Sequence, residues 1–158
     1  MNRTEPKRYA NLFKTIFENR RRGNSPCPIA LLSSLLSGSG SKKTGAKIVL
    51  YQGDTRVLLP EVKEHLGTFD FVFIDGGHSI ETVASDWNSV KDFMGDKTVV
   101  VFDDYYPHLS PGISGMGCRE IVGRLDRDLY SMQKLEPIDT FMKGWGTLEI
   151  QFVKVTKR

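Results

Sequence analysis

Hydrophobic positions near the start of the chain follow the spacing of a helix. Five large side chains recur along one helix face: Tyr9, Leu12, Phe13, Ile16 and Phe17. This spacing predicts an amphipathic helix, and we expect it to end near Gly23 because Pro26 and Pro28 disfavour its continuation. Residues 29–36 form a short apolar segment that we expect to be helical, and the Gly/Ser sequence of residues 37–41 predicts a flexible connector.

From residue 47 onward, the pattern is one of alternating strands and helices. Short hydrophobic runs predict strands at residues 47–52, 69–75 and 98–102. Helices are predicted at residues 55–66, after the capping residue Ser79, and at residues 117–127. The helix after Ser79 carries a hydrophobic stripe of Ile80, Val83, Ala84, Trp87 and Val90. Residues 147–155 alternate hydrophobic and polar side chains, as expected of a half-exposed antiparallel strand.

These elements predict an α/β domain. Continuous hydrophobic strands imply a mostly parallel sheet that is covered on both faces, and the final alternating strand implies an antiparallel edge at the C-terminal end. We therefore expect an N-terminal helical segment and Gly/Ser linker over residues 1–46, followed by the α/β domain over residues 47–158.

Composition narrows the classes of protein that need to be considered. Hydrophobic residues make up 39% and charged residues 26%, which is typical of a soluble globular domain. The net charge of +3 comes largely from short basic clusters at the two ends, so no nucleic-acid partner is expected. Neither a signal peptide nor a membrane-spanning segment is evident. Cys27 and Cys118 form no CxxC pair, and we expect a cytoplasmic protein without a membrane partner.

Polar residues end three of the predicted strands. Gly53 and Asp54 follow the first, residues 75–78 follow the second, and Asp103 and Asp104 follow the third. In an open α/β sheet, ligands bind outside the carboxyl ends of the strands. The sequence therefore predicts a functional cleft at this edge, although a single acidic residue at a strand end is also common as a helix cap or turn residue.

The three aspartates Asp75, Asp103 and Asp104 are candidate metal ligands. Their oxygens suit Mg²⁺ or another divalent cation, which holds a substrate oxygen and lowers its pKa. The competing interpretation is structural: Asp75 caps a helix, and one of the other two aspartates faces water.

His78 is the candidate catalytic residue, because an imidazole at the start of a helix can take the proton of a substrate hydroxyl. A loop hydrogen bond explains it equally well. Gly76 and Gly77 allow a sharp turn or the close approach of a ligand. Asp54 can accept a hydrogen bond from an exocyclic amine, although turn formation explains it nearly as well.

Three segments together resemble a known family: IVLYQGDTRVLLP, FDFVFIDGGHSIETVASDW and KTVVVFDDYY. They look like the central and later part of the class I S-adenosylmethionine-dependent methyltransferases, in the branch whose fourth strand ends in an IDGGH-type sequence and whose fifth ends in DDY. The resemblance covers about residues 47–155. It implies a Rossmann-like fold whose last two strands form an antiparallel pair at the sheet edge, with residues 147–155 as the final strand.

The resemblance also implies a function. The expected activity is methyl transfer from S-adenosylmethionine to the oxygen of a small hydroxylated substrate, with His78 as the base. By the same resemblance, Asp75, Asp103 and Asp104 occupy places similar to those of the metal ligands in metal-dependent O-methyltransferases. The candidate cofactor-binding residues are Asp54, Asp75, Gly76 and Gly77.

The first third of the chain departs from the family pattern. Neither the glycine-rich loop after the first strand nor the acidic end of the second strand is evident before Lys47. Two βα units need about 50–60 residues, and only 46 precede Lys47. We therefore predict a truncated domain, in which one flank of the 69–75 strand is exposed and available for pairing in a homodimer.

Two other functions compete with methyl transfer. The first alternative is a catalytically inactive remnant or interaction module that has lost cofactor binding. A metal-dependent hydrolase ranks last, because no matching set of hydrolase residues is found in the sequence.

Overall fold

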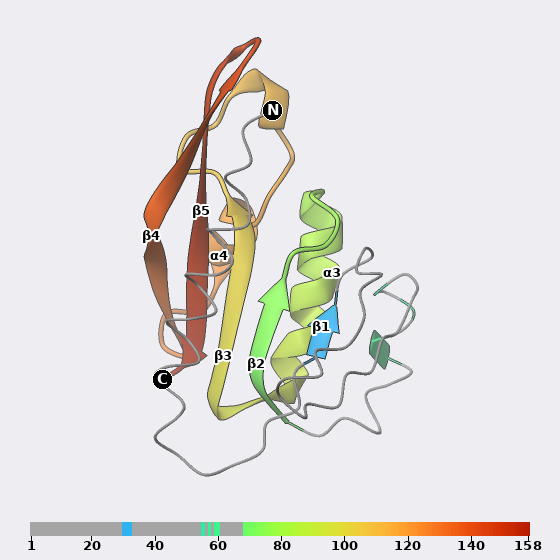
Figure 1. Cartoon of the computed structure of the whole chain (residues 1–158). Coiled ribbons are helices and arrows are strands. Elements are labelled where there is room, and N and C mark those ends of the chain that lie inside the picture. The colour runs from blue at the N-terminus through green and yellow to red at the C-terminus, as the bar shows by residue number, and fades with distance from the viewer. Residues whose placement is uncertain (1–29, 33–54, 56, 58, 61–67) are drawn as a thin grey trace, which may run out of the picture.

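The computed structural model describes residues 30–32, 55, 57, 59–60 and 68–158. Within these residues, five strands form one mixed sheet in the order β1-β2-β3-β5-β4 (Figure 1). The strands are β1 (Ala30–Leu32), β2 (Phe69–Ile74), β3 (Met94–Tyr105), β4 (Tyr130–Lys143) and β5 (Gly146–Lys157). The α-helices are α3 (Ile80–Val90) and α4 (Arg119–Arg124), and the 3₁₀ turns are Lys91–Phe93 and Pro111–Ile113.

The first three strands run parallel to one another. Val72 of β2 pairs with Ala30 of β1 on one side and with Val100 of β3 on the other. All residues of β2 except Asp70 are buried, as the continuous hydrophobic run predicts. Helix α3 connects β2 to β3 and packs beside β2 (Figure 1). The carboxyl ends of β2 and β3 therefore lie next to each other at one edge of the sheet.

The last two strands form a long antiparallel hairpin. Strand β5 pairs with β3 on one side, where Val155 lies opposite Val100, and with β4 on the other, where Phe152 lies opposite Leu135. The predicted antiparallel pair at the sheet edge is thus confirmed, but β5 lies inside the sheet and β4 is the outer strand. A mostly parallel sheet is not confirmed, since the described strands make two parallel and two antiparallel pairings.

The prediction of a helix over residues 29–36 is wrong at residues 30–32, which form β1. The sequence Ala-Leu-Leu has no decisive local preference, and hydrogen bonding to the flank of β2 selects the extended conformation. This flank, expected to be exposed, carries β1 along residues 72–74. The homodimer was predicted because this flank was expected to be exposed, and at these three positions it is paired with β1. Part of the predicted N-terminal segment therefore belongs to the sheet.

Several other predictions fall outside the described residues, namely the opening helix, the connector over residues 37–41 and the strand over residues 47–52. Of the predicted helix over residues 55–66, the described residues 55, 57, 59 and 60 are helical. Helix α4 is shorter than the predicted 117–127. No helix in the described part of the chain is long and apolar enough to cross a membrane.

Helix α3 begins and packs as its sequence predicts. The Ser79 hydroxyl accepts a hydrogen bond from the backbone N–H of Thr82 at 3.2 Å, which caps the first turn. The hydrophobic stripe faces the sheet, with Val83, Trp87 and Val90 buried. The Trp87 ring lies 5.6 Å from the ring of Phe102 on β3, so α3 is fixed against the strand that carries the next site residues.

Phe102 is fully buried at the centre of this packing. Replacing it with alanine leaves a cavity beneath α3, and we expect Phe102→Ala to lower the free energy of unfolding by about 3–5 kcal/mol. Urea denaturation measures this change. The control is Met142→Ala in β4, where the side chain is 80% exposed and the expected change is within about 0.5 kcal/mol. Similar losses in the two variants would contradict this assignment of the core.

Candidate functional site

The candidate site lies where β2 and β3 end. Ile74, the last residue of β2, pairs with Phe102 of β3. Because the two strands are parallel, residues 75–78 leave the sheet beside residues 103 and 104. The structure therefore brings together two of the three strand ends that the sequence placed at one edge, whereas Asp54 lies outside the described residues.

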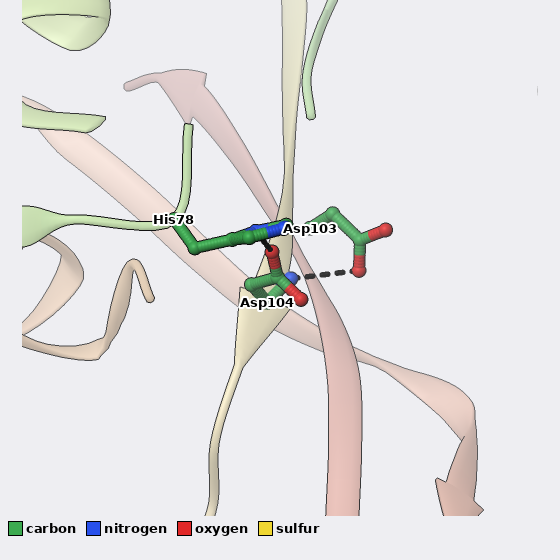
Figure 2. Close-up of polar contacts among 3 residues, drawn as sticks. All are labelled: His78, Asp103 and Asp104. Atoms are coloured by element: carbon green, nitrogen blue, oxygen red, sulfur yellow. Dashed lines mark hydrogen bonds and ion pairs between the residues drawn. The ribbon is translucent and has the colours of Figure 1, made fainter. Parts of the chain in front are cut away.

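A short polar contact at this edge joins His78 to Asp104. The His78 Nδ1 atom lies 2.5 Å from Oδ2 of Asp104 (Figure 2). A carboxylate can only accept a hydrogen bond, so Nδ1 donates and Nε2 is left as the nitrogen that can accept a proton. The His78 side chain is 55% exposed, whereas that of Asp104 is 15% exposed. The arrangement is a carboxylate-oriented imidazole that a ligand can reach.

The two neighbouring aspartates have different surroundings. Asp103 is buried, and its Oδ1 accepts a hydrogen bond from the backbone N–H of Asp104 at 2.7 Å. Asp104 has a φ of 56°, in the left-handed region that aspartate adopts more readily than most residues. Figure 2 shows the result: the Asp104 carboxylate meets the His78 ring, and that of Asp103 points away from it.

A short segment, residues 115–118, connects the two loops of the site. The backbone N–H of Gly117 donates to the His78 carbonyl at 2.7 Å, and that of Cys118 donates to the Asp104 carbonyl at 3.1 Å. Gly117 has a φ of 80°, and a Cβ atom there would lie 2.2 Å from the Asp104 carbonyl oxygen. Only glycine fits this position, so residues 115–118 hold His78 and Asp104 at a fixed spacing.

Two buried titratable groups, the Tyr106 hydroxyl and the Cys118 thiol, lie close enough to Asp104 to be affected by its charge. Burial raises the pKa of the Tyr106 hydroxyl, and the negative charge of Asp104 together with a hydrogen bond to it raises this pKa further. Burial likewise raises the pKa of the Cys118 thiol, and the charges of Asp104 and Asp103 add to the effect. Both groups are therefore neutral near pH 7, and Cys118 does not have the thiolate form that nucleophilic catalysis needs.

Metal binding by Asp75, Asp103 and Asp104 stays a prediction. Among the described residues, no group of three or more His, Cys, Asp or Glu side chains is placed to hold a metal ion. The carboxylates of Asp103 and Asp104 point apart (Figure 2), as the alternation of successive side chains along a strand already predicts. Each of these two carboxylates already accepts a hydrogen bond within the protein.

The predicted cofactor-binding residues that the structure describes lie in the loop after β2. Asp75 and Gly76 are half-buried, and Gly77 is exposed. A Cβ atom at Gly76 would lie 3.2 Å from Oδ2 of Asp86, and one at Gly77 would lie 3.0 Å from Cγ2 of Thr82. Packing of the loop against α3 therefore favours glycine at both positions.

Sequence reasoning missed Gly117 and Asp86. Nothing local marks Gly117, because its requirement comes from the Asp104 carbonyl, which is distant in sequence. Asp86 did carry a signal: it lies three residues after Val83 and four before Val90, on the buried face of the helix. A charged residue at such a position is unusual and normally has a specific partner.

The comparisons with known proteins agree in part with this picture. The sequence model of a family described as a methyltransferase domain matches residues 14–105. The match begins earlier than the resemblance at residue 47, so it includes β1, and it ends with β3. No curated protein sequence matches the chain.

Among solved structures, the chain is similar to precorrin 8w decarboxylase from Methanobacterium thermoautotrophicum, with 13% sequence identity and a TM-score of 0.34. The similarity covers 68% of this chain and 54% of that one. The chain thus spans about half the length of that protein, and a likeness of this size supports no argument about function.

Substitution of Gly117 should disturb both the fold and the site. We expect Gly117→Ala to lower the free energy of unfolding by at least about 2 kcal/mol, since alanine disfavours a positive φ and its methyl group would overlap the Asp104 carbonyl. The matched control is Gly123→Ala in α4, where nothing lies within 4 Å of the added Cβ. In that variant the free energy of unfolding should rise by about 0.5–1 kcal/mol, because alanine favours a helix more than glycine does. Thermal unfolding of both proteins tests this, and a neutral Gly117→Ala would be evidence against the tight contact.

The raised pKa values predict a loss of stability in alkali. The ordinary pKa values are 9.0 for Cys118 and 10.0 for Tyr106, and both groups stay protonated to higher pH in the folded chain. As the pH rises, the unfolded chain loses these protons before the folded chain does. The contribution of the two groups to the free energy of unfolding is therefore complete below about pH 8 and decreases as the pH rises above about 9. Each group accounts for a decrease in the free energy of unfolding of at most about 1.4 kcal/mol per pH unit.

Urea denaturation between pH 7 and pH 11 under reducing conditions measures this slope. Cys118→Ala should make the decrease above pH 9 shallower, and Tyr106→Phe should do the same above pH 10. Slopes identical to that of the unmodified chain would show that neither group is held neutral by the fold.

Proposed function

Starting from the fact that the chain belongs to the methyltransferase domain family, we propose that it transfers a methyl group from S-adenosylmethionine to an oxygen of a small hydroxylated molecule, with His78 as the general base. The observation that carries this proposal is the 2.5 Å contact between His78 and Asp104 at the carboxyl ends of β2 and β3. A base is needed because a hydroxyl is a poor nucleophile until its proton is removed.

Asp104 makes His78 suitable for this step. Its carboxylate holds the proton on Nδ1, so that Nε2 carries the lone pair and takes the proton of the acceptor hydroxyl. The imidazolium that results lies against the Asp104 carboxylate, which stabilises the positive charge. The exposure of His78 leaves the ring accessible to an acceptor from outside. Residues 115–118 fix both partners, which limits the loss of orientation during the reaction.

The loop after β2 is the part of the described chain that would hold the cofactor. When bound, S-adenosylmethionine supplies a methyl group on a positively charged sulfur. The half-buried Asp75 carboxylate can accept hydrogen bonds from its polar groups, and the accessible backbone of Gly76 and Gly77 permits a close approach. Asp54 is proposed as a further contact from the preceding segment. No step is assigned to a divalent cation, because Asp103 and Asp104 point apart.

A non-catalytic remnant or interaction module is the competing function, because the sequence before residue 47 shows no glycine-rich cofactor loop. Calorimetric titration of S-adenosylhomocysteine into the full chain separates the two functions. Saturable binding supports the methyltransferase. Failure of the folded chain to bind would overturn it and leave the remnant or interaction module as the better account.

The role of His78 is tested by His78→Gln. We expect the rate of methyl transfer from S-adenosylmethionine to a mixture of simple phenols and hydroxy acids to fall by about 10²–10⁴-fold. The dissociation constant of S-adenosylhomocysteine should remain within about twofold, because the imidazole acts on the acceptor and not on the cofactor. Methylated products are detected by mass spectrometry.

The matched control is His108→Gln, since His108 is also exposed and lies 3.4 Å from a carboxylate oxygen, that of Glu149. This variant should keep its rate. Equal rates for His78→Gln and the unmodified chain would refute the general-base assignment even if the cofactor binds.

A further inference from the structure

Helix α3 buries a carboxylate that the proposed chemistry does not use. Asp86 is only 5% exposed, and a charged side chain at such a depth is stable only when it has polar partners. The Thr55 hydroxyl donates to its Oδ1 at 2.5 Å. Its Oδ2 lies close to Gly76: a Cβ atom added to this glycine would be 3.2 Å from Oδ2. The two oxygens of one carboxylate therefore face two different segments of the chain.

The loop that contains Gly76 is the one to which cofactor contacts are assigned above, and Gly76 follows Asp75 directly in the sequence. A small cavity of about 10 Å³ lies between Thr55 and this loop, and polar side chains line it beside hydrophobic ones. Its lining residues are Thr55, Leu59, Phe73, Ile74, Asp75, Asp86 and Val90.

We propose that Asp86 is a positioning residue for the cofactor: its buried carboxylate, bonded to Thr55, lies against the loop at Gly76 and so sets the position of the cofactor contacts in that loop. This inference rests on the proposed function. A hydrogen bond to a charged group is strong in a buried, low-dielectric environment, which suits it to fixing a distance. Asp86 acts through Thr55 and Gly76 and does not itself touch the cofactor.

The test removes the hydroxyl while it keeps the shape of the side chain. We expect Thr55→Val to raise the dissociation constant of S-adenosylhomocysteine about tenfold, the ratio that corresponds to one lost hydrogen bond to a charged group. Thr55→Ser keeps the donor and should bind within about twofold of the unmodified chain. Calorimetry gives the constants, and hydrogen exchange should show faster exchange of the Gly76 and Gly77 amides in Thr55→Val alone.

A general loss of stability has to be separated from a loss of positioning. Val122→Ala removes a buried side chain of α4 that does not line this cavity, and it should lower the melting temperature without changing the dissociation constant. If Val122→Ala weakens binding as much as Thr55→Val does, or if Thr55→Ser fails to restore it, the positioning role is overturned.

The two proposals fail in different ways. If the unmodified folded chain binds S-adenosylhomocysteine and Thr55→Val binds it equally well, the positioning role of Asp86 is wrong and the methyltransferase proposal survives. If the unmodified chain does not bind, the methyltransferase proposal is overturned, and the role of Asp86 toward a cofactor is overturned with it.

Discussion

The parallel pairing of β2 with β3 is the constraint on which the rest of the structure depends. It brings Ile74 opposite Phe102, so the two loops that follow these strands emerge side by side. A parallel connection needs a crossover, and α3 supplies it while covering one face of the sheet with Val83, Trp87 and Val90. The hydrophobic contact between α3 and Phe102 therefore fixes the core and, through the same strands, the position of His78 relative to Asp104.

Backbone geometry decides what the aspartates at this edge can do. In a regular strand, Asp103 and Asp104 would already point to opposite faces, and the positive φ at Asp104 alters the direction of its side chain as the strand leaves the sheet. Residues 115–118 hold this turn through the backbone of Gly117 and Cys118. The result is an Asp–His pair, and a three-aspartate metal group is not formed among the described residues.

Two partly or fully buried carboxylates, Asp86 and Asp104, have related physical roles at different depths. Asp104 is near the surface and orients an exposed imidazole, whereas Asp86 lies in the core and accepts from a hydroxyl 31 residues away. In both cases the fold removes most of the water around the carboxylate, which strengthens its hydrogen bonds and makes the loss of a partner costly. Positioning at this site thus depends on charges that the hydrophobic packing has desolvated.

The sequence by itself determined the elements whose signals are local. Continuous hydrophobic runs gave β2 and β3, the capping serine and the stripe with helical spacing gave α3, and the residues at the strand ends gave His78 and its acidic neighbours. Tertiary structure decided everything that depends on a distant partner. Residues 30–32 became a strand because the flank of β2 offered hydrogen bonds, and β5 lies inside the sheet because β4 pairs outside it. The direction of the Asp104 carboxylate depends on a backbone angle that residue types do not encode. Hydrophobic periodicity and capping act within a few residues, whereas pairing partners and side-chain directions are fixed only when the chain has folded.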